Sequence, residues 1–234
     1  MNKKSSSFVI GVSLAACLGL IAACTQPTTN TNLVQTTPTA TPATAHPTAI
    51  ADGDWAGYNR TLTSERFSPL NQITTENVAN LKQVCAFDLG EGGNFQSGVI
   101  VVNNTLYVTS DANTFAIDAA TCQQKWKHHY EKPTPEGLRV NRGAAYADGK
   151  IFRGINTGYL MALDANTGQF LWESKMADPT KGESIPAAPI VWNGMVFIGQ
   201  AGGDNKGVRG RMMAFSPTDG KQLWSFDLVP LTGP

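Results

Sequence analysis

Short apolar stretches broken by polar, turn-forming residues recur along the chain from about residue 96 onward. Three segments share one pattern, an apolar run followed by a polar turn and a second run that ends on Trp: residues 116–126 (AIDAATCQQKW), 162–172 (ALDANTGQFLW) and 214–224 (AFSPTDGKQLW). Each segment predicts a strand, a tight turn and a second strand. One such unit cannot bury its own apolar face, so the repeat predicts a propeller or a solenoid.

A further predicted hairpin precedes each segment, at residues 99–109, 144–154 and 188–199. The turns of these hairpins are dipeptides that accept a positive φ at low cost: Asn103-Asn104, Asp148-Gly149 and Asn193-Gly194. In the later turn, Asp118 and Asp164 can accept hydrogen bonds from backbone amides. Gly168 and Gly220 supply a left-handed residue there. Each repeat is therefore predicted to form four short antiparallel strands, and its β-branched and aromatic content agrees.

A fainter fourth copy of the repeat lies upstream. Residues 82–89 (KQVCAFDL) match residues 221–228 (KQLWSFDL) at five of eight positions, so Cys85 stands where the repeat has Trp. Counting Cys85, the Trp positions are 41 to 52 residues apart, which is the length of a propeller blade. We therefore predict an all-β fold, a partial β-propeller in a domain at residues 51–234. Its four-stranded blades are expected near residues 96–130, 139–175 and 184–228.

Two cysteines are predicted to form a disulfide. Propeller blades of this type dock by stacking the Trp of one blade on the Thr-Gly turn of the next. Cys85 replaces the Trp of one copy and Cys122 replaces the Gly of the next, so both are expected where adjacent blades touch. A disulfide across this separation would stabilise the fold by ~3 to 4 kcal/mol. Two buried free thiols are the alternative.

Residues 1–24 predict a targeting segment. Two lysines form a positive n-region, an apolar run follows, and residues 21–24 (IAAC) have the shape of a lipoprotein cleavage box. We predict lipid modification of Cys24 because a polar tail follows it. A similar box at Cys17 and an uncleaved anchor helix are the alternatives. Acyl chains on Cys24 would tether the protein to a membrane, on its periplasmic or cell-surface side.

The remaining composition narrows the function classes. Residues 25–50 consist mainly of Thr, Pro, Ala and Asn and predict an extended, solvated spacer in which His46 stands alone. Lys and Arg together number 18, as do Asp and Glu, so the formal net charge is zero. Without a basic stripe the chain has no electrostatic footprint for nucleic acid. Once Cys17 and Cys24 are set aside, an even number of cysteines is left, which suits an oxidising compartment.

Four further stretches carry a resemblance to a known family: Asp54-Trp55 with residues 66–70 (RFSPL), residues 73–81 (ITTENVANL), residues 140–143 (VNRG) and residues 199–210 (GQAGGDNKGVRG). They resemble the opening, a short capped helix, a cofactor-pairing stretch and a cofactor-covering loop of the eight-bladed alcohol dehydrogenases that depend on pyrroloquinoline quinone (PQQ). The likeness covers residues 54–234.

This resemblance implies candidate cofactor contacts. PQQ carries three carboxylates, and Arg142 is the candidate for a bidentate pair with one of them. A simple ion pair on the propeller face is the alternative for Arg142. Asn141 beside it, and Gln96, which aligns with a family Glu near the cofactor, are further candidates. Gly202 and Gly203 would let the backbone approach the planar ring closely.

The resemblance also implies a metal ligand. Asp204 aligns with the family's calcium-binding Glu, and Ca²⁺ prefers such oxygen ligands. An ordinary turn aspartate is the alternative. The pattern departs from the family at several positions, since Glu136 and Gly137 replace vicinal cysteines, Pro186 replaces a Thr, and one extra residue precedes GVRG. In the family the catalytic Asp, a second calcium ligand and the Trp beneath the quinone come later, so no catalytic residue is assigned in this chain.

Two functions are compatible with these features. The resemblance implies the N-terminal part of a quinoprotein that oxidises a small alcohol by hydride transfer to PQQ with Ca²⁺. Electrons would pass to a separate acceptor such as a cytochrome c, because the chain has no Cys-x-x-Cys-His haem motif. The alternative is a non-catalytic lipoprotein propeller of the kind that assists outer-membrane β-barrel assembly. About three blades are present where closure takes eight, so an incomplete product is expected.

Adjacent histidines at positions 128 and 129 are a weak candidate for a metal pair. Neighbouring residues of a strand point to opposite faces, so His128 and His129 cannot easily share an ion. We expect both to be surface residues.

Overall fold

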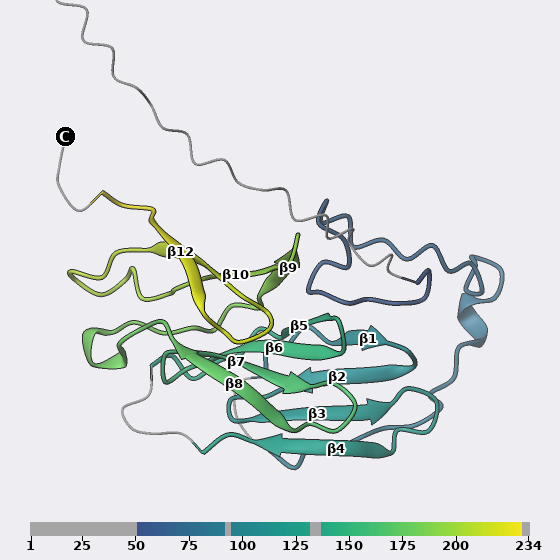
Figure 1. Cartoon of the computed structure of the whole chain (residues 1–234). Coiled ribbons are helices and arrows are strands. Elements are labelled where there is room, and N and C mark those ends of the chain that lie inside the picture. Colours follow the sequence, from purple (N-terminus) through teal and green to yellow (C-terminus); the bar gives the residue numbers. More distant parts are fainter. Residues whose placement is uncertain (1–50, 92–94, 132–136, 231–234) are drawn as a thin grey trace, which may run out of the picture. The chain divides into compact units, whose positions relative to one another are not determined.

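The computed structural model describes residues 51–91, 95–131 and 137–230 of the 234-residue chain. Within these ranges the strands form three antiparallel sheets of four strands each, with neighbouring strands consecutive in sequence (Figure 1). The all-β prediction of four-stranded, blade-like units is confirmed. Two 3₁₀ helices, η1 (Val78–Asn80) and η2 (Pro179–Lys181), accompany the sheets. The described residues contain no helix with the length and apolar character of a membrane span.

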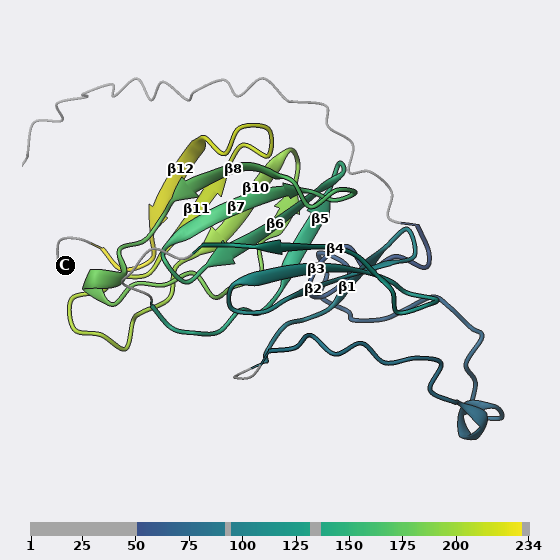
Figure 2. The same cartoon turned by 90° about the horizontal axis from the view of Figure 1, so that it is seen from below.

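Each sheet follows one repeat of the sequence (Figures 1 and 2). The first sheet contains β1 (Ile100–Val102), β2 (Thr105–Thr109), β3 (Asn113–Asp118) and β4 (Gln124–His129). The second contains β5 (Ala144–Ala147), β6 (Lys150–Ile155), β7 (Tyr159–Asp164) and β8 (Phe170–Lys175). The third contains β9 (Ile190–Trp192), β10 (Met195–Gly199), β11 (Arg211–Phe215) and β12 (Gln222–Asp227). The first strands of the three sheets, β1, β5 and β9, lie next to one another.

The hairpin turns have the conformation that their residues predict. All six residues of the three predicted dipeptides have a positive φ, between 47° and 73°. In the later turns, the Asp118 carboxylate accepts hydrogen bonds from the amides of Ala120 and Thr121, and Asp164 does the same for the next repeat. These local bonds fix the direction in which each outer strand returns.

An aromatic residue, an alanine and a tryptophan lie side by side on the second, third and fourth strand of every sheet. The three sets are Tyr107–Ala116–Trp126, Phe152–Ala162–Trp172 and Phe197–Ala214–Trp224. We call each set an aromatic triplet. The register of the outer strand shifts directly after each of these alanines. The small alanine leaves room for the two flanking rings, whose centroids are 5.8 to 6.0 Å apart.

Two of these tryptophans dock their sheet on the next one. Trp126 Nε1 donates to the carbonyl of Ala165 at 2.9 Å, and its ring lies over Gly168. Trp172 Nε1 donates to the carbonyl of Pro217 at 3.3 Å, and its ring lies over Gly220. Trp126 and Trp172 are each at most 9% exposed. Adjacent sheets therefore share apolar cores, which is the predicted docking of a Trp on a glycine turn.

His128 also takes part in this docking. Its Nδ1 atom lies 3.0 Å from the carbonyl oxygen of Gly168, and the side chain is half-buried. The expectation that it is a surface residue is therefore wrong for His128, because β4 turns this residue toward the second sheet together with Trp126. Burial lowers the pKa of His128 below its ordinary value. His129, one residue further, is exposed as expected.

Two upstream segments differ from their expected form. Residues 82–89 form no strand, although they match the outer strand of the repeat; Phe87 and Leu89 pack on the first sheet instead. A strand needs a hydrogen-bonded neighbour, and the described residues provide none there. The helix expected at residues 73–81 is reduced to η1, none of whose residues is buried. Short helices without a packed face are unstable in water.

Candidate functional site

The residues just before the first strand of each sheet, β1, β5 and β9, come together in the structure. We call them lead-in segments; they are residues 96–98, 141–143 and 186–188. The amide of Gly98 donates to the carbonyl of Arg142 at 3.0 Å, and the amide of Arg142 donates to the carbonyl of Pro186 at 2.9 Å. The stretches that carry Gln96, Arg142 and Pro186 are therefore neighbours, although they are about 45 residues apart in sequence.

Glycine permits the closest of these approaches. Gly98 and Gly143 form a parallel bridge, and Gly143 has a φ of 123°, which other residues rarely adopt. A Cβ atom on Gly143 would lie 2.7 Å from the carbonyl oxygen of Gly98. The final glycine of the VNRG motif is thus needed to bring the first and second lead-in segments together.

Asn141 anchors the second lead-in segment from beneath. Its side chain is only 2% exposed, and its Nδ2 donates to the carbonyl of Gly154 at 2.8 Å. Its Oδ1 accepts from the Thr109 hydroxyl at 2.6 Å and from the Gly143 amide at 3.0 Å. Thr109 in turn shares a 2.9 Å hydrogen bond with the hydroxyl of Ser97. The structure therefore gives Asn141 a positioning role, and the cofactor contact expected of it stays a prediction.

A small cavity of about 300 Å³ opens between the second and third lead-in segments. Its walls include Arg142, Pro186, Phe197, Gln200 and Met212. Gln200 Nε2 donates to the carbonyl of Arg209, whereas Gln200 Oε1 is buried without a hydrogen-bond partner in the described part of the chain. Buried acceptors are rarely left unpaired. Gln200 thus brings an acceptor without an internal partner to the cavity that Arg142 also lines.

The side chain of Arg142 is accessible to a ligand. It is exposed, and it lines both the small cavity and a larger groove of about 1420 Å³. Among the described residues no carboxylate pairs with its guanidinium, so the structure gives no ion pair of the kind considered as the alternative. A planar guanidinium that is free of internal partners suits a carboxylate ligand. Gln96, also exposed, lies on the neighbouring first lead-in segment.

The structure gives Gly202 of the glycine-rich loop a packing role, and the cofactor contacts expected of Gly202 and Gly203 stay predictions. Gly202 has a φ of 123°, and a Cβ atom there would collide with the carbonyl of Gly182. The absence of a side chain at Gly202 thus lets the loop pack against Gly182, in the connection that follows β8. Gly203 faces open space. Asp204 lies on an exposed turn and lines neither the cavity nor the groove.

A complete metal site is not formed by the described residues. They contain no group of three or more His, Cys, Asp or Glu side chains that could hold an ion. Ca²⁺ takes six to eight oxygen ligands, and Asp204 offers one carboxylate. The calcium contact expected of Asp204 stays a prediction.

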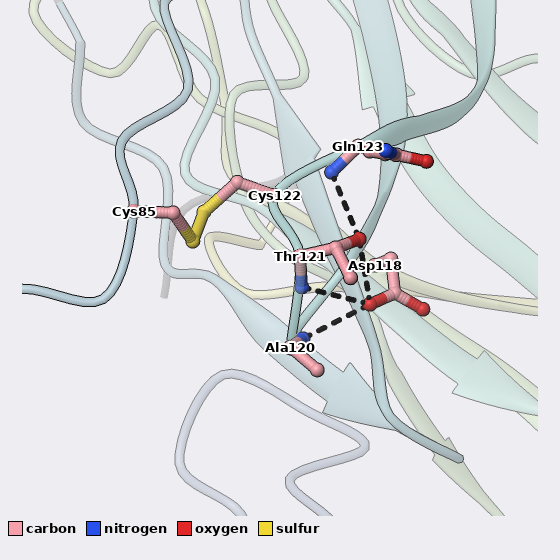
Figure 3. The surroundings of a disulfide bond; sticks show 6 residues. All are labelled: Cys85, Asp118, Ala120, Thr121, Cys122 and Gln123. Carbon is pink, nitrogen blue, oxygen red and sulfur yellow. Dashed lines mark hydrogen bonds between the residues drawn. A yellow bond between two sulfur atoms is a disulfide. The ribbon is translucent and has the colours of Figure 1, made fainter.

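The predicted disulfide between Cys85 and Cys122 is present (Figure 3). Their Cα atoms are 6.0 Å apart, and the bond lies beside the turn that Asp118 caps. Hydrogen bonds from Thr121 hold the pKa of Asp118 below its ordinary value. Cys122 has a φ of 57°, close to the 71° and 72° of Gly168 and Gly220 at the same place in the other turns. The covalent bond therefore replaces a Trp–Gly docking contact.

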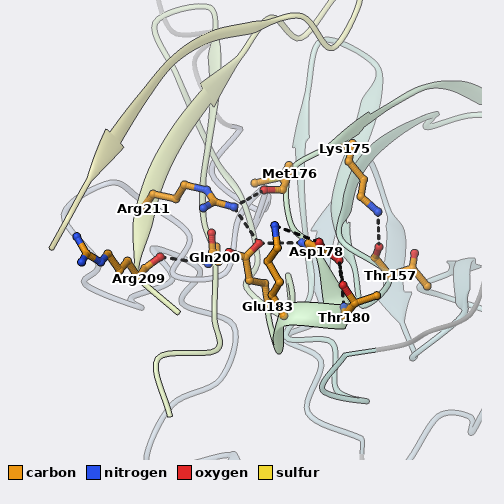
Figure 4. A network of polar contacts seen from close by, with 10 residues as sticks. Thr157, Lys175, Met176, Asp178, Thr180, Glu183, Gln200, Arg209 and Arg211 are labelled. Carbon is orange, nitrogen blue, oxygen red and sulfur yellow. Dashed lines mark hydrogen bonds and ion pairs between the residues drawn. The ribbon is translucent and has the colours of Figure 1, made fainter. Parts of the chain in front are cut away.

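A partly buried ion pair fixes the strand that follows the glycine-rich loop (Figure 4). Arg211 Nη2 donates to Glu183 Oε2 at 2.9 Å and to the carbonyl of Met176 at 3.0 Å. The amide of Asp178 donates to the same carboxylate at 2.8 Å. Glu183 is 8% exposed, so this pair has few alternative geometries. The amide of Gln200 donates to the carbonyl of Arg211, which places Gln200 beside the cavity.

Arg153 of β6 links the second sheet to the loop between β2 and β3 of the first sheet. It is completely buried, and it donates to the carbonyls of Asn113, Ser110 and Asp111 at 2.6 to 3.0 Å. Burial lowers the pKa of Arg153 to about 10, so the side chain is charged at neutral pH. The loop between β2 and β3 is thereby fixed next to the lead-in segments.

Sequence reasoning missed several of these residues. Thr109 and Gln200 belong to stretches already singled out, but no local pattern marks a hydroxyl or an amide that becomes buried across two sheets. The sequence does indicate a structural role for Arg153, because an arginine within the apolar run of residues 151–155 needs buried hydrogen-bond acceptors. The predictions for Cys24, Cys17, His46 and Glu136 lie outside the described residues.

Comparison with known proteins identifies relatives over most of the chain. A family model for the β-propeller domain of PQQ glucose/ethanol/alcohol dehydrogenases matches residues 55–233. The lanthanide-dependent methanol dehydrogenase of Methylacidiphilum fumariolicum is 39% identical over 182 residues, which are 74% of this chain and 30% of the relative. The dehydrogenase subunit of the alcohol dehydrogenase (quinone) of Gluconobacter oxydans is 36% identical, over 76% of this chain and 25% of the relative.

A solved structure agrees with these relatives. The quinohemoprotein alcohol dehydrogenase from Comamonas testosteroni superposes with a TM-score of 0.70 at 32% sequence identity. The match covers 76% of this chain and 28% of that one. The chain thus spans less than a third of the length of these proteins.

Proposed function

Since the chain belongs to the β-propeller family of PQQ-dependent alcohol dehydrogenases, we propose that it forms a cofactor-binding part of a quinoprotein that oxidises a small alcohol. The observation that carries this proposal is the meeting of three lead-in segments around the unpaired guanidinium of Arg142. Family membership favours this function over the outer-membrane scaffold, with which the chain shares the Trp-turn repeat and the predicted lipid anchor.

The residues around Arg142 fit the carboxylates of PQQ. A guanidinium donates two parallel hydrogen bonds to a carboxylate, and Arg142 projects where the cavity and the groove meet. Asn141 holds the backbone of Arg142 in place through its buried hydrogen bonds. Pro186 lacks the hydroxyl of the Thr that the family has there, but its carbonyl accepts from the Arg142 amide and so also positions this residue.

The chemistry of oxidation belongs to the cofactor. When bound, PQQ supplies the electron acceptor for the alcohol. In this proposal the described residues bind and orient the quinone, and none of them acts as the catalytic base. They do not by themselves fit a metal ion, because they offer only the single carboxylate of Asp204, so no step through Ca²⁺ or a lanthanide is assigned to them.

A titration of the purified chain with PQQ tests this proposal. Quenching of the tryptophan fluorescence reports binding. Arg142→Ala should weaken binding at least tenfold, because a hydrogen bond to a charged group contributes about 1.5–3 kcal/mol. Arg60→Ala removes another arginine from the wall of the same groove and should change the Kd less than twofold. Equal binding by the wild type and Arg142→Ala, or no binding of PQQ to the wild type, would contradict the proposal.

We also propose that the protein is anchored through a lipid on Cys24, on the periplasmic or cell-surface side of a membrane. The sequence of residues 1–24 supports this location. There the chain would meet its alcohol substrate and a separate electron acceptor such as a cytochrome c. Labelling of cells with a radioactive fatty acid should mark the wild type and Cys17→Ser but not Cys24→Ser. Labelling that depends on Cys17 would move the anchor to that residue.

A further inference from the structure

Residues 54–58 lie across β1 and β5, the first strands of the first two sheets. The amide of Trp55 donates to the carbonyl of Val101 at 2.6 Å, and the amide of Val101 donates to the carbonyl of Trp55 at 3.0 Å. The amide of Tyr146 in β5 donates to the carbonyl of Ala56 at 2.8 Å. We call residues 54–58 the strap. Its backbone joins the two strands that follow the first and second lead-in segments.

The strap ends on the first lead-in segment. The ring of Tyr58 packs on Gly98, since a Cβ atom on Gly98 would lie 2.6 Å from Cδ2 and 2.7 Å from Cε2 of Tyr58. The amide of Gly98 donates to the carbonyl of Arg142, and Gly98 forms the parallel bridge with Gly143. Tyr58 also lines the larger groove together with Arg142. The ring therefore lies at the point where the first two lead-in segments meet.

This contact explains the glycine at position 98. Unlike Gly143, Gly98 does not have a positive φ, so its backbone conformation is open to other residues. The ring of Tyr58 is what excludes a side chain there. The next nearest atom to a Cβ on Gly98, the carbonyl oxygen of Arg142, would lie 3.5 Å away, which is an ordinary contact.

The loop that follows the strap folds back onto Tyr58. The guanidinium of Arg66 lies 5.0 Å from the centroid of the Tyr58 ring, an attractive arrangement of a cation and an aromatic face. Arg66 Nε donates to Asn59 Oδ1 at 2.7 Å. Three residues of this loop, Arg60, Ser64 and Arg66, have a positive φ between 51° and 68°. Such conformations are costly and persist where the surrounding contacts require them.

We propose that Tyr58, held by Arg66, is a positioning residue of the site around Arg142. It keeps the first lead-in segment, which carries Gln96, against the second, and it acts through the hydrogen bond between Gly98 and Arg142. The inference rests on the proposed function, because the site that Tyr58 positions is the one assigned to PQQ. It gives a role to the opening stretch of the domain, in which Trp55 fixes the strap and Arg66 fixes the ring.

Hydrogen exchange of the purified chain without PQQ tests the contact itself. In Tyr58→Ala the amide of Gly98 should exchange about tenfold faster, because local opening of the lead-in segment becomes easier. The amides of β7, within the cores of the second sheet, should keep their wild-type rates and so show that the chain is folded. Tyr58→Phe retains the ring and should restore the wild-type exchange of Gly98.

The Kd for PQQ, from the quenching of tryptophan fluorescence, tests the effect on the site. Tyr58→Ala should raise the Kd about fivefold, because a less ordered site binds more weakly. Tyr58→Phe should restore the wild-type Kd. Leu62→Ala is the matched control, since Leu62 is an exposed apolar residue in the wall of the same groove, and it should leave the Kd unchanged.

Gly98→Ala approaches the same contact from the other side. Its methyl group meets the ring of Tyr58, so this variant should also bind PQQ more weakly than the wild type. In the double variant with Tyr58→Ala the methyl group has room. The double variant should therefore bind no more weakly than Tyr58→Ala alone, whereas two independent structural defects would add.

The possible failures are distinguishable. If the wild type does not bind PQQ, the proposed function falls, and the role of Tyr58 in PQQ binding falls with it. If the wild type binds PQQ, three results overturn the present inference alone: wild-type exchange of Gly98 in Tyr58→Ala, an unchanged Kd in Tyr58→Ala, or additive losses in the double variant.

Discussion

One backbone conformation determines whether a tryptophan can dock on a turn. Gly168 and Gly220 have a positive φ, and a Cβ atom on Gly168 would lie 2.6 Å from the ring of Trp126. Cys122 holds the same conformation in the first sheet although it has a side chain. It can do so because Cys85, rather than an indole ring, lies against it. Glycine is thus required here by the ring above it as well as by φ.

Two glycine substitutions separate these effects. Gly194→Ala, in a hairpin turn with open space around it, should lower the free energy of unfolding by about 1 kcal/mol, the cost of a left-handed alanine. Gly220→Ala should cost a further ~1 to 3 kcal/mol, because the added methyl group meets the ring of Trp172. Urea unfolding of the two variants measures the difference. Equal losses of unfolding free energy would mean that Trp172 docks equally well on a turn whose residue carries a Cβ atom.

His128 makes the stability of the docked sheets depend on pH. Burial lowers its pKa in the folded state below the ordinary value of 6.5, so the unfolded chain binds the proton more readily. The contribution of neutral His128 is complete above about pH 6.5 and is lost as the pH falls through the range below it. In His128→Gln the free energy of unfolding should change less with pH between pH 7 and pH 5 than it does in the wild type. His129→Gln, the exposed neighbour, should retain the wild-type slope.

At the scale of elements, the disulfide acts as one member of a series of docking contacts. Cys85 and Cys122 occupy the positions that Trp126 and Gly168, or Trp172 and Gly220, occupy in the next contacts. The covalent bond holds a segment that forms no strand of its own. A segment without sheet partners needs such a link, since packing of Phe87 and Leu89 alone buries little surface.

Replacement of both cysteines tests this equivalence. The Cys85→Ser, Cys122→Ser variant should lose ~3 to 4 kcal/mol of unfolding free energy, because the loop constraint on the unfolded chain disappears. The Cys85→Trp, Cys122→Gly variant restores the residues of the repeat and should recover part of that loss. Denaturant unfolding compares the three chains. A Trp–Gly variant that is no more stable than the double serine variant would show that the two contacts are not equivalent.

The sequence predicted the elements better than it predicted their connections. The Trp-turn repeat was enough for the four-stranded sheets and for the disulfide, because both follow from local turn chemistry and from alignment of the copies. The roles of Asn141 and Gly202 could not be obtained in this way. Their partners, Thr109 and Gly182, lie in other sheets or connections, and only the packed structure shows which polar atoms are used internally.

At the scale of the whole molecule, the described residues supply part of a binding site and part of a propeller. The three lead-in segments meet around Arg142, whereas Asp204 belongs to no group of three or more His, Cys, Asp or Glu side chains among the described residues. One face of the third sheet likewise leaves large apolar side chains exposed, among them Trp192, Trp224 and Phe226. Both features agree with a chain that spans less than a third of the relatives it matches.

The central claim is that the lead-in segments form one site for PQQ. Hydrogen exchange of the purified chain, measured with and without saturating PQQ, tests it directly. The account predicts slower exchange at residues 97–98, 141–143 and 187–188 together, and no such effect in Arg142→Ala. Protection at the wall of the larger groove, residues 57–64, with none at the lead-in segments would contradict it.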